Sequence, residues 1–204
     1  LVEAGTLQGV GRIDGDLLQT GGLVEVRGSQ TVVSENFIQD DDATLKIEVA
    51  GSRPSAYMKV DGLAILEGTL QFAISDQYET FPFYPGDEFR LVSAAYGLIG
   101  EFEEIALPEL PAGLAWSLER TLRDLTLELI AGDYNADGVV DAADYTAWRD
   151  TLGTQVTKGS GADGNRDGWV NEHDMYLWQE FFGRHVFAPA ANIAGQAANS
   201  LAVP

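Results

Sequence analysis

The sequence predicts a mainly β fold that ends in a small α-helical module. Up to Ala131, short runs of alternating apolar and polar residues are separated by Gly, Asp and Pro turns, which is typical of β-strands. From residue 132 onward, an acidic 12-residue loop occurs twice, and a short helical segment follows each copy. We therefore expect three parts: residues 1–131, residues 132–185 and a tail, residues 186–204.

The alternation in the first part predicts which side chains share a core-facing side of each strand. These are Leu45, Ile47 and Val49; Leu70, Phe72 and Ile74; and Leu125, Leu127 and Leu129. Short strands with frequent glycine turns fit a β-sandwich or a β-solenoid. The closely spaced phrases of residues 5–22 favour the solenoid.

Three sequence segments, in this order along the chain, support the solenoid: "MKVDGLAILEGTLQFAI", "YPGDEFRLVSAAYGLIGEF" and "LPELPAGLAWSLERTLRDLTLEL". Residues 5–130 resemble the closing segment of the right-handed β-helix in large bacterial surface proteins of the autotransporter-passenger kind. The resemblance implies a β-helix-like domain. Such a fragment has open ends with unpaired strand edges, so we expect a covering segment or partner at residues 1–28.

The charge balance limits the classes of partner. The chain has 32 acidic and 12 basic residues and a net charge of -20, which disfavours nucleic acids and anionic membranes and favours cations. It has no cysteine, which excludes disulfides and thiolate metal sites. No apolar run is long enough for a membrane span. Because the chain starts at Leu1, we expect a processed form or a fragment.

The doubled loop has the spacing of a calcium site. Calcium takes six to eight oxygen ligands, and a 12-residue loop supplies them from positions 1, 3, 5, 9 and 12 and from the carbonyl at position 7, with glycine at position 6. Gly138 and Gly168 occupy position 6. The expected ligands of the first loop are Asp133, Asn135, Asp137, Val139, Asp141 and Asp144, and those of the second are Asp163, Asn165, Asp167, Trp169, Asn171 and Asp174. Two complete matches predict two Ca²⁺ ions.

Both loops end in Asp at position 12, where EF-hands have Glu. The segments that follow also repeat, "DYTAWRDTLG" and "DMYLWQEFFG". Residues 132–185 thereby resemble the dockerin module of bacterial cell-surface proteins. The resemblance implies a paired EF-hand-type loop–helix fold whose folding is coupled to calcium. We expect its shared core to contain Trp148, Leu152, Trp178, Phe181 and Phe182.

Dockerins typically bind cohesin modules through helix residues that include loop positions 10 and 11. These positions are Ala142–Ala143 and Glu172–His173, and they differ from the Ser/Thr pair of cellulosomal examples. The mismatch between the halves argues against symmetric, dual-mode binding. The partner predicted by the resemblance is a cohesin-like protein.

The sequence carries no recognisable catalytic motif. His173 and His185 have no neighbours that would form a triad or a zinc site. We interpret Glu101, Glu103 and Glu104 as a solvated strand face and Asp40–Asp42 as a turn. The prediction is a non-enzyme in which no pair of acids in residues 1–131 forms a cleft with a carbohydrate-sized pocket between them. Binding of a carbohydrate stays open.

The tail carries no charge from Val186 to Pro204. We expect it to run extended along a β-domain, its own or that of a neighbouring copy, with Phe187, Ile193, Leu201 and Val203 as apolar anchors. The second case predicts a self-assembling subunit.

The combination of parts resembles exported surface proteins of planctomycetes and related bacteria. It predicts a secreted, non-catalytic protein of the bacterial cell surface with a structural or attachment role. The alternative is the non-catalytic C-terminal end of a larger polysaccharide-degrading enzyme that is anchored through dockerin–cohesin binding.

Overall fold

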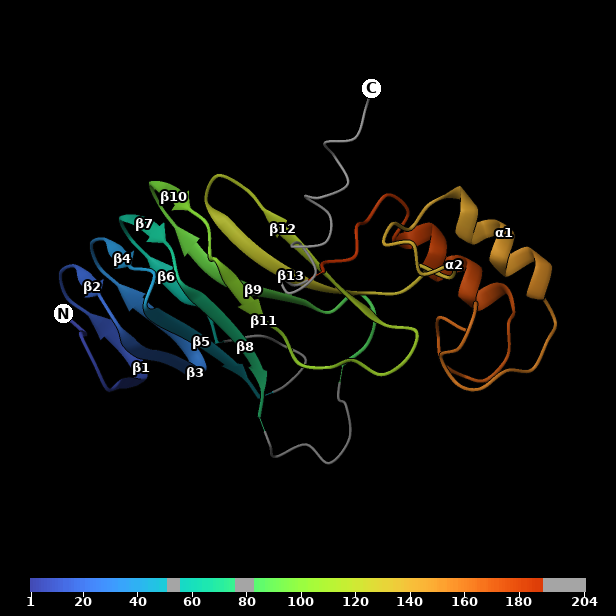
Figure 1. Cartoon of the computed structure of the whole chain (residues 1–204), viewed down its shortest axis with the longest axis horizontal. Coiled ribbons are helices and arrows are strands. Elements are labelled where there is room, and N and C mark those ends of the chain that lie inside the picture. The colour runs from blue at the N-terminus through green and yellow to red at the C-terminus, as the bar shows by residue number, and fades with distance from the viewer. Residues whose placement is uncertain (51–55, 76–82, 189–204) are drawn as a thin grey trace, which may run out of the picture.

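The computed structural model describes residues 1–50, 56–75 and 83–188, with the side chain of Val10 excepted. The described chain forms an elongated body of strands followed by two short helices, with the N-terminus at the end of the body opposite the helices (Figure 1). The fold is therefore mainly β with a small α-helical module, as the sequence predicts. No described helix is long and apolar enough to cross a membrane.

The strands are short and follow one another closely. They are β1 (Thr6–Ile13), β2 (Leu17–Gln19), β3 (Gly22–Val33), β4 (Phe37–Gln39), β5 (Ala43–Val49), β6 (Met58–Val60), β7 (Leu63–Leu66), β8 (Thr69–Ile74), β9 (Glu88–Ala94), β10 (Gly97–Gly100), β11 (Glu104–Ala106), β12 (Ala115–Arg120) and β13 (Asp124–Ile130).

These strands form two sheets, and the chain passes repeatedly from one sheet to the other. The larger sheet has nine strands in the order β11-β8-β5-β3-β6-β9-β13-β12, with β1 paired to β3, and the smaller has the order β10-β7-β4-β2. Pairing is parallel up to β11. Among the named strands of the described residues, the β12–β13 hairpin and its contact with β9 are antiparallel. Successive turns of the chain are thus stacked in register.

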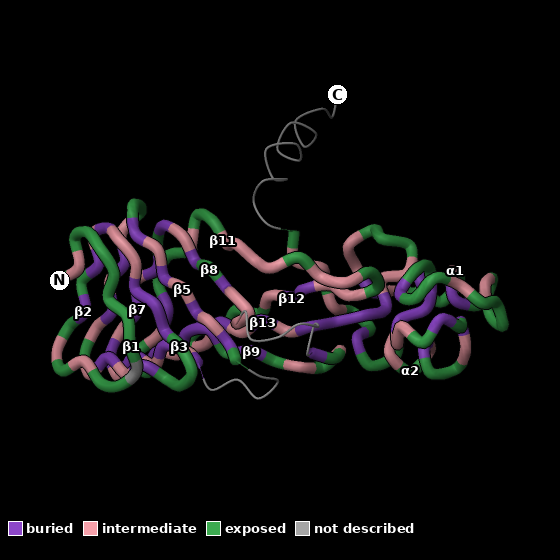
Figure 2. The backbone as a smooth tube through the Cα atoms, turned by 90° about the horizontal axis from the view of Figure 1, so that it is seen from below, coloured by how far each residue is buried: buried purple, intermediate pink, exposed green. Residues whose placement is uncertain are grey.

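The alternating pattern fills the space between the sheets, as predicted. Leu45, Ile47 and Val49 are at most 1% exposed, and Leu125, Leu127 and Leu129 at most 4%. Figure 2 shows these buried stretches along the strands. Near the second module an aromatic cluster closes the core, with Phe89 in ring contact with Phe72, Phe83 and Trp116.

Two buried glutamines tie successive turns together. Gln19 on β2 and Gln39 on β4 are neighbours in the parallel register and are both 0% exposed. Gln19 Nε2 donates to the carbonyls of Gly22 and Thr44 at 3.1 and 2.9 Å, and Gln39 Nε2 donates to those of Ala43 and Thr69 at 3.0 and 3.1 Å. Each amide therefore links its own turn to the next one.

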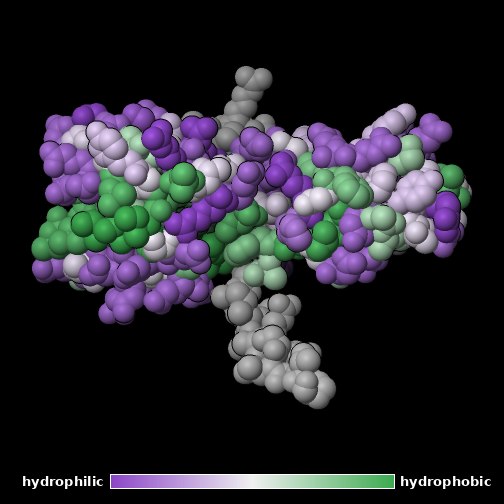
Figure 3. All heavy atoms as spheres, turned by 90° about the horizontal axis from the view of Figure 1, so that it is seen from above, coloured by the Kyte–Doolittle hydropathy of each residue, from purple (hydrophilic) through white to green (hydrophobic). Residues whose placement is uncertain are grey.

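The smaller sheet carries an apolar ladder on its outer side. Leu18, Ile38, Ile65 and Ile99 pair in register across β2, β4, β7 and β10. Leu18 and Ile99 are 36% and 53% exposed. These strands lie along the upper side in Figure 1, and Figure 3, seen from above, shows a hydrophobic area there. No local pattern in the sequence predicts this ladder.

The second module contains α1 (Ala142–Thr151) and α2 (Glu172–Glu180). Each helix begins with a capping box. The side chain of the N-cap residue, Asp141 in α1 and Asn171 in α2, accepts a hydrogen bond from a helix N–H. The aspartate three residues later, Asp144 or Asp174, accepts one from the N–H of the N-cap residue. Gly153 and Gly183, with φ of 82° and 86°, follow the helix ends. Residues 189–204, with the expected anchors Ile193, Leu201 and Val203, lie outside the described residues.

Candidate metal centre

Both loops turn at the glycine that a calcium loop requires at position 6. Gly138 has φ 95° and Gly168 has φ 93°, a region that residues with a Cβ rarely adopt. Position 4 is left-handed as well, with φ 57° at Ala136 and 61° at Arg166. The loops therefore repeat one backbone conformation, including a position that the sequence did not mark because neither residue is glycine.

Three predicted ligand residues of the first loop meet around one backbone N–H. The Asp137 N–H donates to Asp133 Oδ1 at 3.1 Å and to Asn135 Oδ1 at 2.9 Å. Asn135 Nδ2 donates to Asp137 Oδ2 at 2.8 Å. Positions 1, 3 and 5 thus lie side by side.

The second loop repeats this arrangement and is more enclosed. The Asp167 N–H donates to Asp163 Oδ1 at 3.1 Å and to Asn165 Oδ1 at 2.9 Å. Asp163 Oδ2 also accepts from the backbone N–H groups of Gly159 and Gly168, each at 2.9 Å. Asp163 is 0% exposed, whereas Asp133 is partly exposed.

The aspartate at position 12 closes each loop from the inside. Asp144 is 0% exposed and accepts from the N–H groups of Tyr134, Asn135 and Asp141 at 2.7, 3.0 and 2.8 Å. A carboxylate has about four lone-pair sites, so three N–H donors leave capacity for a cation.

Asp174 takes the same place in the second loop. It is 0% exposed and accepts from Asn165 N at 3.1 Å and from Asn171 N at 2.8 Å.

The residues at positions 7 and 9 also make hydrogen bonds within the module, in addition to their predicted role as ligands. At position 9, Asp141 Oδ1 accepts from Ala143 N at 2.7 Å, and Asn171 Oδ1 accepts from His173 N at 2.8 Å. Asn171 Nδ2 reaches the carbonyl of Trp169 at 3.3 Å. The side chain at position 9 is therefore a helix cap, and in the second loop it also lies beside the position-7 carbonyl.

The charge on the loops favours a bound cation. Burial raises the pKa of Asp133 and of Asp174, and the charges of Asp163 and Asp167 raise the pKa of Asp174 further. The hydrogen bond from Asn165 lowers the pKa of Asp167. Buried carboxylates of like charge are stable in the ionised form only when positive charge offsets them. The predicted ligand atoms are all oxygens, which fits a hard cation such as calcium.

Carboxylates alone do not make a site here. Among residues 1–50, 56–75 and 83–188, no group of three or more His, Asp or Glu side chains is arranged to hold a metal ion. A cation in either loop therefore also needs the amide oxygens of Asn135 or Asn165 and the carbonyl of Val139 or Trp169. The six predicted ligands of each loop follow this mixed pattern.

The two loop–helix units pair with each other reciprocally. After α1, Val156 N donates to Gly168 O at 2.9 Å, and after α2, Val186 N donates to Gly138 O at 2.8 Å. Trp148 Nε1 donates to the carbonyl of Asn171 at 2.8 Å. In the equivalent contact, Trp178 Nε1 donates to that of Asp141 at 2.7 Å. Each unit therefore completes the loop of the other.

The module has two small cores rather than the single shared one that the sequence suggested. Trp148 packs with Ala162 and Val170, and Phe181 packs with Ile130 and Val140.

The prediction for Leu152 and Phe182 was wrong, because their side chains are 49% and 56% exposed. The helical repeat identifies equivalent positions but not which of them faces water. Phe182 instead contacts Trp178, which contacts Tyr145, so an aromatic row lies on the helix surface.

One residue breaks the symmetry of the two loops. Tyr134, at position 2 of the first loop, is partly buried and donates from its hydroxyl to the carbonyl of Asp174 at 2.6 Å. Its equivalent is Gly164, where an added Cβ would lie 2.6 Å from the Tyr134 hydroxyl. A single tyrosine thus fills the space between the loops, and the Tyr/Gly pair is the sequence signal that could have indicated it.

Comparison with known families gives one match. Residues 131–180 match the dockerin type I domain. The matched segment is about a quarter of the chain and covers both loop–helix units. Dockerin domains are non-catalytic modules that bind cohesin proteins, typically bind calcium and occur in extracellular or cell-surface proteins. The match supports calcium and a protein partner for this module. No curated protein and no solved structure matches the chain.

Proposed function

We propose that this chain is a non-catalytic, calcium-stabilised attachment protein of the bacterial cell surface. Its residues 132–185 hold two Ca²⁺ ions and bind a cohesin-like protein. The observation that carries the proposal is the dockerin type I match on two loop–helix units that complete each other's loops. Residues 1–131 serve as the support on which the module is displayed.

The support is a β-solenoid of the kind that closes bacterial surface β-helices. The alternation of the chain between two sheets, whose pairing is parallel up to β11, and the glutamine bonds between successive turns favour this assignment over a β-sandwich. The antiparallel β12–β13 hairpin ends the stack beside the module.

The partner surface is the aromatic row of Tyr145, Trp178 and Phe182. Adjacent ring centroids in the row lie 5.4 Å apart. Tyr145 and Phe182 are exposed, whereas Trp178 is partly buried between them and the module core. Large exposed aromatics are common anchors of protein interfaces. The residues at loop positions 10 and 11, Ala142–Ala143 and Glu172–His173, are also exposed at the helix starts.

Surface plasmon resonance with an immobilised type I cohesin domain tests this proposal. The full chain is expected to bind in calcium and not in chelator, and Phe182→Ala is expected to weaken binding more than about tenfold. Tyr96→Ala is the control, because Tyr96 is an exposed aromatic, at 80%, that lies on the β-domain between β9 and β10 and not on the module. A folded, calcium-loaded chain that does not bind would contradict the cohesin partner.

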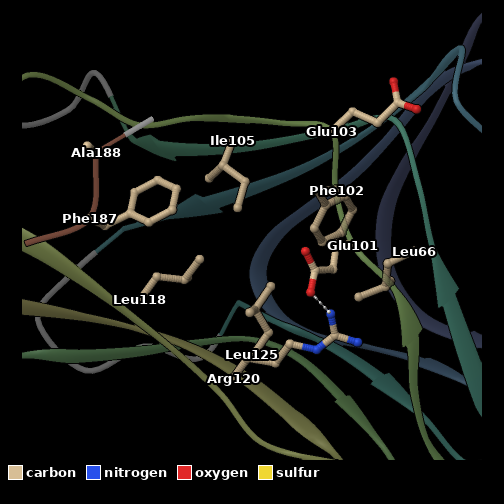
Figure 4. A pocket seen from close by; sticks show the side chains of 10 residues that line it. All are labelled: Leu66, Glu101, Phe102, Glu103, Ile105, Leu118, Arg120, Leu125, Phe187 and Ala188. Carbon is tan, nitrogen blue, oxygen red and sulfur yellow. Dashed lines mark ion pairs between the residues drawn. The ribbon is translucent and has the colours of Figure 1, made fainter. Parts of the chain in front are cut away.

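The absence of catalysis is part of the proposal, and one cavity bears on it. A cavity of about 290 Å³ is lined by Glu101, Glu103, Arg120 and mostly apolar residues, so two acids lie at its border. Glu101 pairs with Arg120 at 3.3 Å, and Figure 4 shows the carboxylate of Glu103 directed away from the cavity. The two carboxylates do not face each other across a substrate-sized space, which supports a non-catalytic cavity.

The alternative function is the C-terminal end of a larger polysaccharide-degrading enzyme. The dockerin match favours it, because such a module would anchor an enzyme through the same cohesin contact. Determination of the full precursor sequence distinguishes the two, since only the alternative requires a catalytic domain upstream.

Self-assembly is a second candidate, and the outer ladder of Leu18, Ile38, Ile65 and Ile99 favours it. An exposed apolar stripe of this kind marks interaction sites. Ile65→Asp places a charge in the middle of the ladder and is expected to abolish any concentration-dependent rise in sedimentation coefficient. A wild-type chain that remains monomeric at high concentration would contradict self-assembly.

A further inference from the structure

The segments that follow the two helices are equivalent within the module, but the residues that come next in each differ in their contacts. After Val156 comes Thr157, which is exposed, and the chain continues into the second loop. After Val186 comes Phe187, which packs against the core of the β-domain. We propose that residues 184–188, here named the strap, couple calcium binding in the first loop to docking of the module on the β-domain.

One side of the strap is bound to the β-domain. Phe187 N donates to Trp116 O at 2.6 Å, and its ring lines the cavity between β-strands that Figure 4 shows. The Arg184 guanidinium lies 3.0 Å from Glu128 and 3.4 Å from Glu119. The Glu128 side chain is 13% exposed and that of Arg184 is 38% exposed, so the pair lies at the edge of the joint with the Glu128 carboxylate largely buried.

The other side of the strap is bound to the first loop. Val140 N donates to Arg184 O at 2.9 Å, and Val186 N donates to Gly138 O at 2.8 Å. The N–H of Gly138 in turn donates to Asp133 Oδ2 at 3.1 Å. The peptide groups of Gly138 therefore connect a predicted calcium ligand directly to the strap.

The second loop has no connection to the strap through its own paired segment. Val156 N bonds Gly168 O, and Val156 packs against the core of Trp148, Ala162 and Val170. The second loop meets the β-domain at another point, Gly159, whose N–H donates to Asp163 Oδ2 at 2.9 Å and which lies against Ala112. The two loops are therefore expected to respond unequally to loss of Phe187: the strap supports the first loop and leaves the second unaffected. Because coupling between sites is reciprocal, calcium in the first loop also holds the strap on the β-domain.

This inference rests on the calcium binding proposed above, and calorimetry of the full chain separates the two. Asp163→Asn disables the second loop, so calcium titration of that variant reports the first loop. Asp133→Asn disables the first loop, so calcium titration of that variant reports the second loop. In the Asp163→Asn background, Phe187→Ala is expected to weaken calcium binding about tenfold. In the Asp133→Asn background it is expected to change binding less than about twofold.

The control variant is Thr157→Ala, the equivalent of Phe187 after the first helix, and no change is expected from it in either background. Phe187→Leu keeps an apolar side chain and is expected to retain most of the affinity, which guards against misfolding of the alanine variant. Equal effects of Phe187→Ala on both loops, or no effect on the first, would overturn the coupling. Absence of calcium binding in both backgrounds would overturn the proposed calcium function itself.

Hydrogen exchange supplies a second readout. Calcium is expected to slow amide exchange of residues 184–188 in the full chain and to have no such effect in Asp133→Asn. Exchange in the strap that is equally fast with and without calcium would contradict the proposal.

Discussion

Glu25 on β3 is a buried carboxylate whose charge is offset by neighbours on the same sheet. Its side chain is 5% exposed and lies 2.8 Å from Lys46 Nζ and 3.1 Å from Arg27 Nε. Burial opposes ionisation, but Lys46 and Arg27 outweigh it and hold the pKa of Glu25 below its usual range. A lowered pKa in the folded state contributes stability above the usual glutamate pKa, and this contribution is lost as the pH falls through the folded value.

We therefore expect Glu25→Gln to lower the free energy of unfolding by about 1 kcal/mol at neutral pH, because Lys46 and Arg27 lose one carboxylate but keep Glu48. The loss is expected to shrink as the pH falls below the usual glutamate pKa toward the lowered pKa of the folded state, where the wild-type carboxylate also becomes protonated. Urea denaturation at neutral and at acidic pH measures it. A loss that is the same at both would show that packing, not charge, explains the effect.

Asp133 and Asp141 are both predicted calcium ligands, but their surroundings differ. Asp133 lies against Asn135 and Asp137, while Asp141 caps α1. Asp133→Asn is expected to weaken calcium binding in the first loop at least about tenfold, because it removes a charged ligand.

Asp141→Asn is the control for this change, because it preserves the cap in the way that Asn171 does in the second loop. It is expected to change calcium binding by about threefold or less, since position 9 often binds through water. Calorimetric titration compares the two variants. A larger effect at Asp141 would reverse the assigned roles.

At the scale of elements, the bonds from Gln39 link the turn of β4 to that of β8. Gln39→Leu leaves the carbonyls of Ala43 and Thr69 without this donor inside the core, and we expect a loss of about 2 kcal/mol. Gln71→Leu, on the exposed side of β8, should change stability by less than about 0.5 kcal/mol. Denaturant midpoints of the two variants measure the difference, and equal midpoints would show that the glutamine bonds do not stabilise the stack.

The elements that the sequence predicted are those with a local signal. Alternation located the strands around Leu45, Leu70 and Leu125, and the ligand spacing located both loops. The glutamine bonds and the outer ladder depend on register between turns far apart in the chain, which no local period encodes. Burial of Leu152 and Phe182 was predicted wrongly because the orientation of a short helix is set by its partner.

At the scale of the whole molecule, the module and the β-domain meet where two glycines approach each other. A Cβ on Gly159 would overlap the carbonyl of Ala112, and one on Gly113 would lie 2.8 Å from Gly159 O. Gly159→Ala is therefore expected to push the module off the β-domain and to lower the free energy of unfolding by about 2 kcal/mol more than Gly161→Ala.

Gly161 is a suitable control because it also has positive φ, 60° against 76°, but has no atom within 4 Å of an added Cβ. Both variants share the conformational strain, so only the close approach differs. Small-angle scattering is expected to show a larger maximum dimension for Gly159→Ala alone. Identical scattering of the two variants would contradict a close joint.

The central claim is that calcium holds the two loop–helix units in their folded, paired form, since each buries aspartates such as Asp144, Asp163 and Asp174 that need positive charge. Far-ultraviolet circular dichroism of the full chain during chelation tests it most directly. We predict that the helical signal is lost in excess chelator, that the β signal persists, and that added calcium restores the helices. A helical signal unchanged by chelation would contradict the account.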